Sequence, residues 1–250
     1  MDKSLTGKKI FFLYPQSVIQ DEMIYSLLEH GYEVYIIKDH IKALSIFREF
    51  DNSICFINID YKIKGSGWEE YITAMKNDPA TKNIQIGILS YNNDPNLKKK
   101  FLLDLGVECG FVQLKLGIKQ SEEIILKVLE ANEAKGRRKF VRVYCGDDPR
   151  VLVKINYQEN DYEGQIIDLS SVGIACKFSS AVPASNKEVL KNIQLNLRGS
   201  LLTVDGIILG RRNDDEKILI ILFNPRPSEK DLEKIYMFIH RMLQRSIDEE

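Results

Sequence analysis

The stretch GRRKFVRVY, residues 136–144, divides the chain into two halves with different patterns. Before it, apolar runs of strand length alternate with amphipathic helical segments, and after it short strands follow one another. The stretch also gathers Arg137, Arg138, Lys139 and Arg142 in a chain whose formal net charge is -1. It therefore marks a change of fold and raises the question of what this local positive charge binds.

The half before this stretch consists of strand-like runs that are each followed by a helical segment. The expected strands are 8–14, 33–37, 53–60, 83–90 and 110–114, and the expected helices are 18–31, 41–50, 68–76, 94–106 and 121–134. Gly31 is expected just beyond the first helix, and Asp94 and Ser121 are expected as N-caps. This alternation predicts a doubly wound parallel sheet of flavodoxin-like order 2-1-3-4-5, with helices on both faces.

The order of these units and the sequence AMKNDPATKNIQIGILS (74–90) resemble the receiver domain of bacterial response regulators, over about residues 7–134. The resemblance implies a phosphoacceptor aspartate after the third strand, a hydroxyl after the fourth and a lysine after the fifth. The third strand offers Asn58 or Asp60 in the acceptor region, and Ser90 and Lys115 match the other two positions.

The receiver family also has an acidic pair after the first strand that holds Mg²⁺, and this pair is missing. Tyr14, Pro15 and Gln16 stand there instead. Because Mg²⁺ requires several oxygen ligands, we expect residues 1–134 to form a degenerate receiver-like domain with a folding, docking or dimerising role. Phosphorylation of Asp60 is the rival interpretation.

The half after residue 135 is predicted to be all β with a terminal helix. The expected strands are 150–157, 162–170, 173–178, 192–198, 200–210 and 217–223, and the helix is 228–246. Short strands at this spacing indicate an antiparallel sheet or small barrel. The helix has an apolar stripe that we expect to pack on the barrel.

Two short motifs in this half carry the functional interpretation in combination. The arginine cluster has the form RRxxxR and opens the all-β segment, and DLSSVG (168–173) has the form DxSxxG and runs into an alternating strand. Together they resemble the PilZ domain, a six-stranded β-barrel family that binds cyclic di-GMP, over about residues 136–248. We expect residues 135–250 to form this domain. The resemblance implies a cyclic di-GMP site. The implied binding residues are Arg137, Arg138, Arg142, Asp168, Ser170 and Gly173.

The chemistry of cyclic di-GMP agrees with these residue types. Arginine forms bidentate contacts with the O6/N7 edge of guanine and with phosphate, and it stacks on bases. The carboxylate of Asp168 accepts from guanine N–H donors, and Ser170 donates to or accepts from base or phosphate. Gly173 allows a ligand to approach its backbone or the turn to take a positive φ. Arg211 and Arg212 are expected to be exposed turn residues, with a place at the rim of the site as the alternative.

The arginine motif lies on the segment that joins the predicted domains. We therefore expect ligand binding to order residues 135–142, to change the interdomain arrangement, and to signal to an unidentified protein partner. The alternative is a PilZ scaffold that docks protein partners without nucleotide. The oligomeric state is left open.

Composition argues against several other classes of protein. The near-neutral charge disfavours a nucleic-acid polymer as partner. The four cysteines form no CxxC pair, so no zinc site is expected, and they are expected to be small buried apolar residues. No signal peptide or membrane span is predicted, which favours a cytoplasmic location. No nucleophile–base pair or phosphate-binding glycine loop points to an enzyme, and no metal or cofactor is expected.

Overall fold

The computed structural model describes residues 7–16, 22–63, 66–212 and 215–248. By contacts it divides into two compact units, Met1–Lys139 with Gln244–Glu250, and Phe140–Leu243. This division does not coincide with the predicted boundary after residue 134, because the segment up to Lys139 is counted with the first unit.

The first unit is the predicted doubly wound parallel sheet. Its strands are β1 (Lys9–Leu13), β2 (Val34–Ile37), β3 (Ser53–Asn58), β4 (Gln85–Ser90) and β5 (Phe111–Gln113). They run parallel in the order β2-β1-β3-β4-β5. Every residue of β3 is buried, as is typical of a strand that is covered on both faces.

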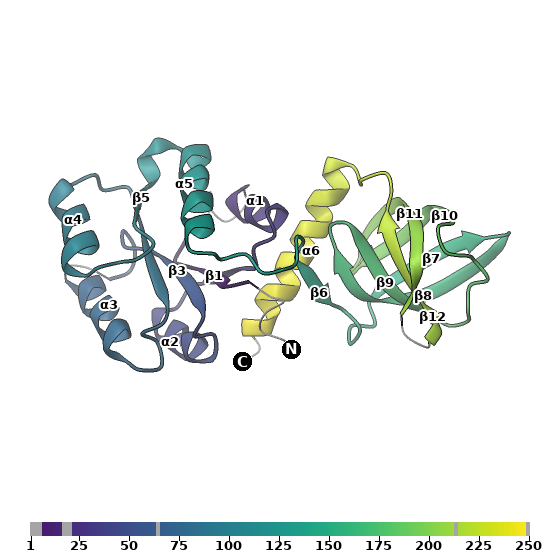
Figure 1. The fold of residues 1–250 in the computed structure, drawn as a ribbon, viewed down its shortest axis with the longest axis horizontal. Helices are drawn as coiled ribbons and strands as arrows, with labels where there is room; N and C mark the ends of the chain where they lie inside the picture. The colour runs from purple at the N-terminus through teal and green to yellow at the C-terminus, as the bar shows by residue number, and fades with distance from the viewer. Residues whose placement is uncertain (1–6, 17–21, 64–65, 213–214, 249–250) are drawn as a thin grey trace. The chain divides into compact units, whose positions relative to one another are not determined.

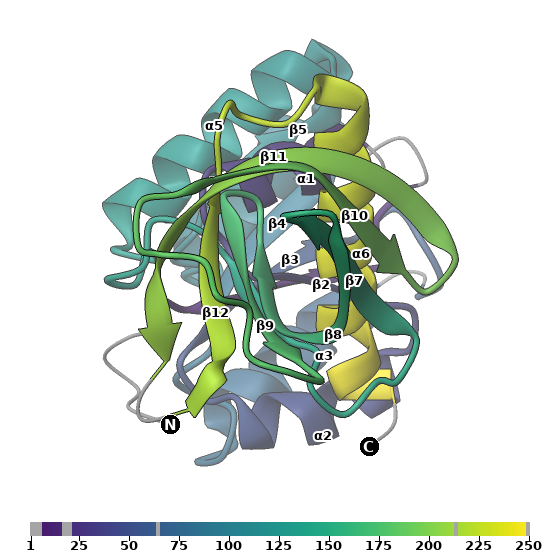
Figure 2. The same cartoon turned by 90° about the vertical axis from the view of Figure 1, so that its right-hand side faces the viewer.

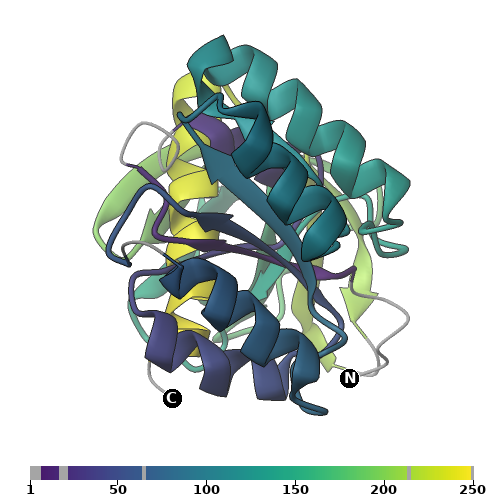
Figure 3. The same ribbon diagram turned by 90° about the vertical axis from the view of Figure 1, so that its left-hand side faces the viewer.

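Helices cover both faces of this sheet: α1 and α5 lie on one face and α2 and α3 on the other (Figures 1 and 3). The helices are α1 (Ile24–Glu29), α2 (His40–Glu49), α3 (Gly67–Asn77), α4 (Pro95–Lys99) and α5 (Ile118–Ala131). Residues 18–21 of the predicted first helix lie outside the described residues. A π-helical turn, η2 (Lys100–Asp104), continues α4.

The predicted helix ends are confirmed at two of three positions. Gly31 follows α1 with a φ of 88°, and the carboxylate of Asp94 accepts from the backbone N–H of Asn96 as an N-cap. Ser121 is not a cap. The helix α5 begins earlier, after Gly117, and the Ser121 hydroxyl donates to the Gly117 carbonyl at 2.9 Å from inside the first turn.

The second unit is a closed six-stranded antiparallel barrel with a further strand at its side (Figure 2). The added strand is β6 (Arg142–Tyr144), and the barrel strands are β7 (Val151–Tyr157), β8 (Asn160–Ser170), β9 (Gly173–Phe178), β10 (Val189–Leu197), β11 (Ser200–Arg212) and β12 (Asp215–Phe223). Pairing of β8 with β9 closes the ring, so the barrel strands have no open edge. The strand β6 was not predicted.

The core of the barrel follows the predicted alternation of apolar and polar residues. In β7, Val151, Val153 and Ile155 are buried, whereas Leu152 is exposed. The helix α6 (Glu229–Asp248) follows the barrel and buries most of its apolar stripe, including Leu232, Ile235 and Ile239. All four cysteines are free and buried, as predicted. No helix of the described chain is long and apolar enough to cross a membrane.

Candidate functional site

The strand β6 places the last arginine of RRxxxR beside the DxSxxG motif. It pairs antiparallel with the end of β8, with Arg142 opposite Ser170 and Tyr144 opposite Asp168. Val141 and Val143 are each 5% exposed, so they anchor this short strand, while the Arg142 side chain is exposed. The two predicted motifs therefore meet through backbone pairing, although Arg142 and Asp168 are 26 positions apart in the sequence.

A β-bulge positions Asp168. The register of β8 with β9 shifts between Ile166 and Asp168, which pair with Cys176 and Ala175, so Ile167 has no opposite residue. Its carbonyl instead accepts from the Cys145 N–H at 2.6 Å. Because a bulge changes the direction in which neighbouring side chains point, it sets the orientation of the Asp168 carboxylate.

The carboxylate of Asp168 forms an ion pair with an arginine from another strand. Arg212 Nη2, at the end of β11, lies 2.6 Å from Asp168 Oδ2. The Asp168 side chain is 13% exposed, so this ion pair is largely shielded from water. A carboxylate has several lone pairs, so Asp168 can accept further hydrogen bonds beside the ion pair.

Ser170 and Gly173 shape the turn after β8. The Ser170 hydroxyl donates to the Gly173 carbonyl at 3.2 Å, and Ser170 is 5% exposed. A Cβ on Gly173 would lie 2.4 Å from the Ile221 carbonyl oxygen of β12. Gly173 does not adopt a left-handed φ, so the positive-φ interpretation is wrong. The strand needs glycine here because β12 packs against its backbone.

These side chains surround a small pocket of about 140 Å³. Its polar lining comes from Arg142, Asp168, Ser170 and Arg212, and its apolar lining comes mainly from side chains of strands β9, β11 and β12. Those apolar residues include Leu209, which is 56% exposed. The pocket combines two cations, one carboxylate and an apolar wall, so it is suited to a ligand with anionic and flat apolar parts.

The residues beside the pocket add an aromatic surface and an inert thiol. Tyr144 is 55% exposed. Its pKa is raised, first by the nearby Asp147 carboxylate, whose Oδ1 lies 3.4 Å from the hydroxyl. Burial, aided by Asp168, raises the pKa of the Cys145 thiol to about 12, so this cysteine is a neutral packing residue.

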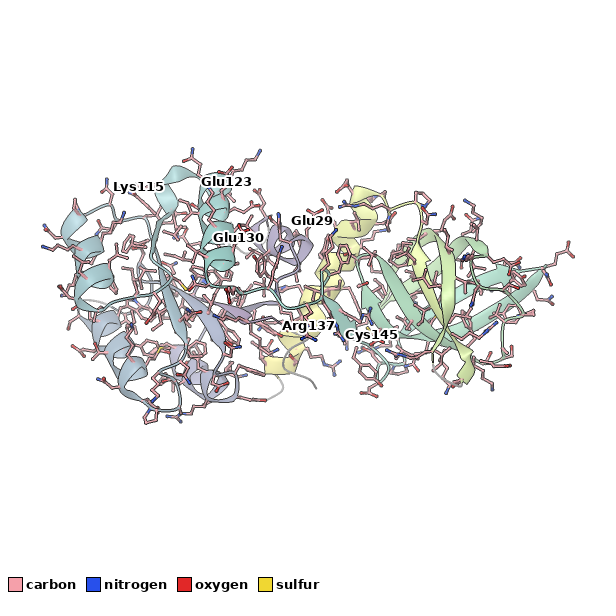
Figure 4. All side chains as sticks on the ribbon, viewed as in Figure 1. Glu29, Lys115, Glu123, Glu130, Arg137 and Cys145 are labelled. Carbon is pink, nitrogen blue, oxygen red and sulfur yellow. The ribbon has the colours of Figure 1, made fainter. Side chains whose placement is uncertain are left out.

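Arg137 and Arg138 belong to the first unit, whereas Arg142 belongs to the second. Arg137 lies on the segment after α5 with an exposed side chain (Figure 4). Arg138 is half-buried. The backbone of this segment packs closely on the turn after α1, since a Cβ on Gly31 would lie 2.5 Å from the Lys139 carbonyl oxygen. The described structure thus unites Arg142, Asp168, Ser170 and Gly173 in one pocket of the second unit, and the first two arginines belong to the first unit.

Arg211 and Arg212 are not exposed turn residues. Both lie in β11 and are half-buried. Arg211 donates through Nη2 to the carbonyls of Val182 and Ala184, each at 2.9 Å, and therefore ties a loop to the barrel. Arg212 lines the pocket, which agrees with the alternative expectation of a place at the rim of the site. Its ion pair with Asp168 was not predicted, because neither the spacing of the two residues nor their neighbours indicate this pair.

The receiver-like positions of the first unit are partly assembled. Asp60 accepts from the Ser90 hydroxyl at 2.6 Å and from the Tyr91 N–H at 2.6 Å. Lys115, between β5 and α5, is exposed (Figure 4). Among the salt bridges of the described residues, none joins it to Asp60. The part of the chain that the structure describes contains no group of histidine, cysteine, aspartate and glutamate that could hold a metal ion.

Comparison with known proteins gives a family for the second half of the chain. The model of the PilZ domain family matches residues 136–240. No curated protein matches the sequence of the chain.

Several solved structures are similar to parts of this chain, and three examples show the range. One is the PilZ domain with c-di-GMP of YcgR from Escherichia coli, with 17% identity and a TM-score of 0.37 over 45% of this chain and 95% of that chain. The K. pneumonia MrkH–c-di-GMP complex has 19% identity and a TM-score of 0.39 over 47% of this chain and 57% of that chain. The chemotaxis response regulator CheY4 of Vibrio cholerae has 19% identity and a TM-score of 0.42 over 51% of this chain and 99% of that chain. With residues 136–240, this chain carries a PilZ domain.

Proposed function

We propose that the protein is a receptor for cyclic di-GMP and that the pocket between β6, β8 and β11 is part of its binding site. The observation that carries the proposal is the pairing of β6 with β8, which sets Arg142 opposite Ser170 and beside Asp168. The PilZ domain at residues 136–240 supports the same ligand.

The groups of the pocket match the parts of the ligand. The exposed guanidinium of Arg142 binds a phosphate or the O6/N7 edge of a guanine. Asp168 accepts from the N1–H and N2–H groups on the opposite guanine edge, and Arg212 holds its carboxylate in place through the ion pair. The Ser170 hydroxyl contributes a further hydrogen bond at the turn.

The pocket alone is too small for the whole ligand. Its volume of about 140 Å³ is below the roughly 300–1,000 Å³ of ordinary small-molecule sites. We therefore propose that Arg137 and Arg138 complete the site on binding, as the RRxxxR resemblance implies. Both arginines precede Phe140, where the second unit begins.

Recruiting these arginines is the proposed link between binding and signalling. The segment that ends at Lys139 packs against Gly31 of the first unit. Moving it to the ligand exchanges those contacts for arginine–ligand contacts, which shifts the population of interdomain arrangements. Small-angle scattering at saturating cyclic di-GMP should differ from the ligand-free profile. An unchanged profile would contradict the rearrangement and leave binding itself in place.

A protein partner that distinguishes the two arrangements is proposed to carry the signal onward. In the scaffold alternative, the barrel docks its partner without nucleotide. The two are separated by Arg138→Ala/Arg142→Ala, which removes a nucleotide-dependent interaction and leaves nucleotide-independent docking intact.

The experiment that tests the proposed function is calorimetric titration of cyclic di-GMP into the full chain. We expect a dissociation constant of about 1 μM or below, no binding of GTP or cyclic di-AMP, and loss of binding in Arg142→Ala. Lys177→Ala, an exposed cation on β9 that does not line the pocket, is the charge-matched control and should bind as wild type. Absence of binding to the folded wild-type chain would contradict the proposal.

A further inference from the structure

A second pocket lies in the first unit, at the carboxyl ends of its central strands. Its volume is about 610 Å³, within the roughly 300–1,000 Å³ of small-molecule sites. Tyr14 and Gln16 reach it from the end of β1, Lys38 from the end of β2, and Asn58 from the end of β3. The strand order changes direction between β1 and β3, and open α/β sheets bind ligands in the crevice at such a switch point.

The charge of this pocket is opposite to that of a receiver metal site. Lys38 and Lys62 line it, and its described lining contains no carboxylate. Within the described residues neither lysine forms a salt bridge, so each ammonium group keeps donors for a ligand. A divalent cation would find two positive charges and too few oxygen ligands. The pocket therefore favours an anion.

The acidic residues next to these lysines in the sequence are engaged with other groups. Asp39 caps α2, with its carboxylate accepting from the N–H groups of Ile41 and Lys42. These bonds, led by the one from Lys42, lower the pKa of Asp39. Asp60 accepts from Ser90 and from the Tyr91 N–H.

An aromatic wall completes the pocket. Tyr61 is 55% exposed, and its ring centroid lies 5.4 Å from that of Tyr14. The indole N–H of Trp68 donates to the Tyr61 carbonyl at 3.1 Å and fixes the backbone of this residue. An exposed tyrosine ring with a fixed backbone offers a face on which a planar group can stack.

Backbone strain coincides with the lining of this pocket. Tyr14 and Lys62 have φ values of 54° and 64°, a region that residues with side chains seldom adopt. Asn58 holds the strained Tyr14 by donating from Nδ2 to its carbonyl at 2.9 Å. Such conformations persist where the surroundings enforce them, and they concentrate at ligand sites.

We propose that this pocket binds a mononucleotide, with Lys38 and Lys62 on its phosphate and Tyr61 against its base. Phosphate alone would fill only a small part of about 610 Å³. The proposal is independent of the cyclic di-GMP site, because none of the residues that line the two pockets are shared.

The chain carries its own reporter for this site. Trp68 is the single tryptophan, and its ring centroid lies 6.1 Å from that of Tyr14. The test titrates AMP, GMP, CMP and UMP into the full-length Arg142→Ala chain while Trp68 fluorescence is recorded. Equilibrium dialysis with labelled nucleotide runs in parallel, so a silent fluorophore does not hide binding. The Arg142→Ala background keeps the barrel site from contributing.

We expect saturable binding of at least one mononucleotide. Inorganic phosphate and the matching nucleoside should each bind about tenfold or more weakly than the nucleotide. The nucleotide should likewise bind Lys38→Gln/Lys62→Gln about tenfold or more weakly than the chain with both lysines. Tyr61→Leu should weaken binding of the nucleotide and leave binding of phosphate unchanged. The control is Lys82→Gln/Lys127→Gln, two exposed lysines outside the pocket, and it should bind as wild type. No saturable binding by dialysis, or equal binding by the two double variants, would overturn the proposal.

Discussion

Gly173→Ala tests the packing between β9 and β12 beside the proposed cyclic di-GMP site. The added Cβ would lie 2.4 Å from the Ile221 carbonyl oxygen and 3.2 Å from the Leu222 Cα, whereas ordinary contacts begin at 3.4 Å. The strand β12 would have to move by about 1 Å. It is paired with β9 on one side and β11 on the other, so neither neighbour leaves it free to move.

The expected cost follows from this overlap. Overpacking a well-packed core costs about 1–3 kcal/mol, and the lower entropy of the unfolded alanine chain returns about 0.4–1 kcal/mol. A net loss of about 1–2 kcal/mol lowers the melting temperature of a domain of about 100 residues by roughly 4–16 °C. The assay is thermal unfolding of the full chain by calorimetry, following the transition of the barrel.

The control for this variant is Lys177→Thr on the same strand. Lys177 is exposed and pairs with Asp215 at 3.0 Å, so its replacement should cost less than about 1 kcal/mol. If Gly173→Ala melts at the wild-type temperature and loses cyclic di-GMP binding, glycine is needed there for the ligand to approach the backbone. That result would refute the explanation by packing against β12.

Three further predictions concern the barrel unit. Asp168→Asn should weaken the binding of cyclic di-GMP by about 100-fold, since a carboxylate that accepts two guanine N–H bonds becomes a group with one acceptor and one donor. Calorimetry measures this affinity, and a wild-type value would contradict the role assigned to Asp168. Arg211→Ala removes hydrogen bonds to backbone carbonyls, so it should lower the free energy of unfolding by about 1–3 kcal/mol and with it the melting temperature. The affinity for cyclic di-GMP should stay unchanged. The pKa of His240 is lowered by burial and then by Arg241, so the unfolded chain binds more protons below pH 6.5. Stability should therefore fall as the pH drops from about 7 to 5, by at most about 1.4 kcal/mol per unit; chemical denaturation of wild type and His240→Gln should show this slope reduced in the variant.

The fold could be predicted where local patterns and chain topology agree. Buried apolar runs such as β3, and caps such as Asp94, are properties of a few neighbouring residues. The start of α5 was misplaced because Gly117 ends the preceding turn in a left-handed conformation that the sequence does not distinguish from a loop. The strand β6 has three residues and forms by pairing with residues 168–170 of β8, beyond the part of β8 that pairs with β7.

The site was predictable in its motif and not in its full membership. Asp168, Ser170 and Gly173 lie within six residues, so one motif names them together. Arg212 reaches Asp168 from β11, and its position depends on register shifts at Ile208/Gly210 and Arg211/Arg212. Bulges depend on tertiary packing, and a one-residue change of register would turn this side chain to the other face.

The measurement that tests the central claim most directly is amide hydrogen exchange of the wild-type chain with and without cyclic di-GMP. The account predicts slower exchange on binding in residues 137–144 and in 168–173, since the ligand contacts both motifs and orders the segment between the units. Protection confined to other parts of the chain, or binding that leaves both stretches unchanged, would contradict the claim that RRxxxR and DxSxxG form one site.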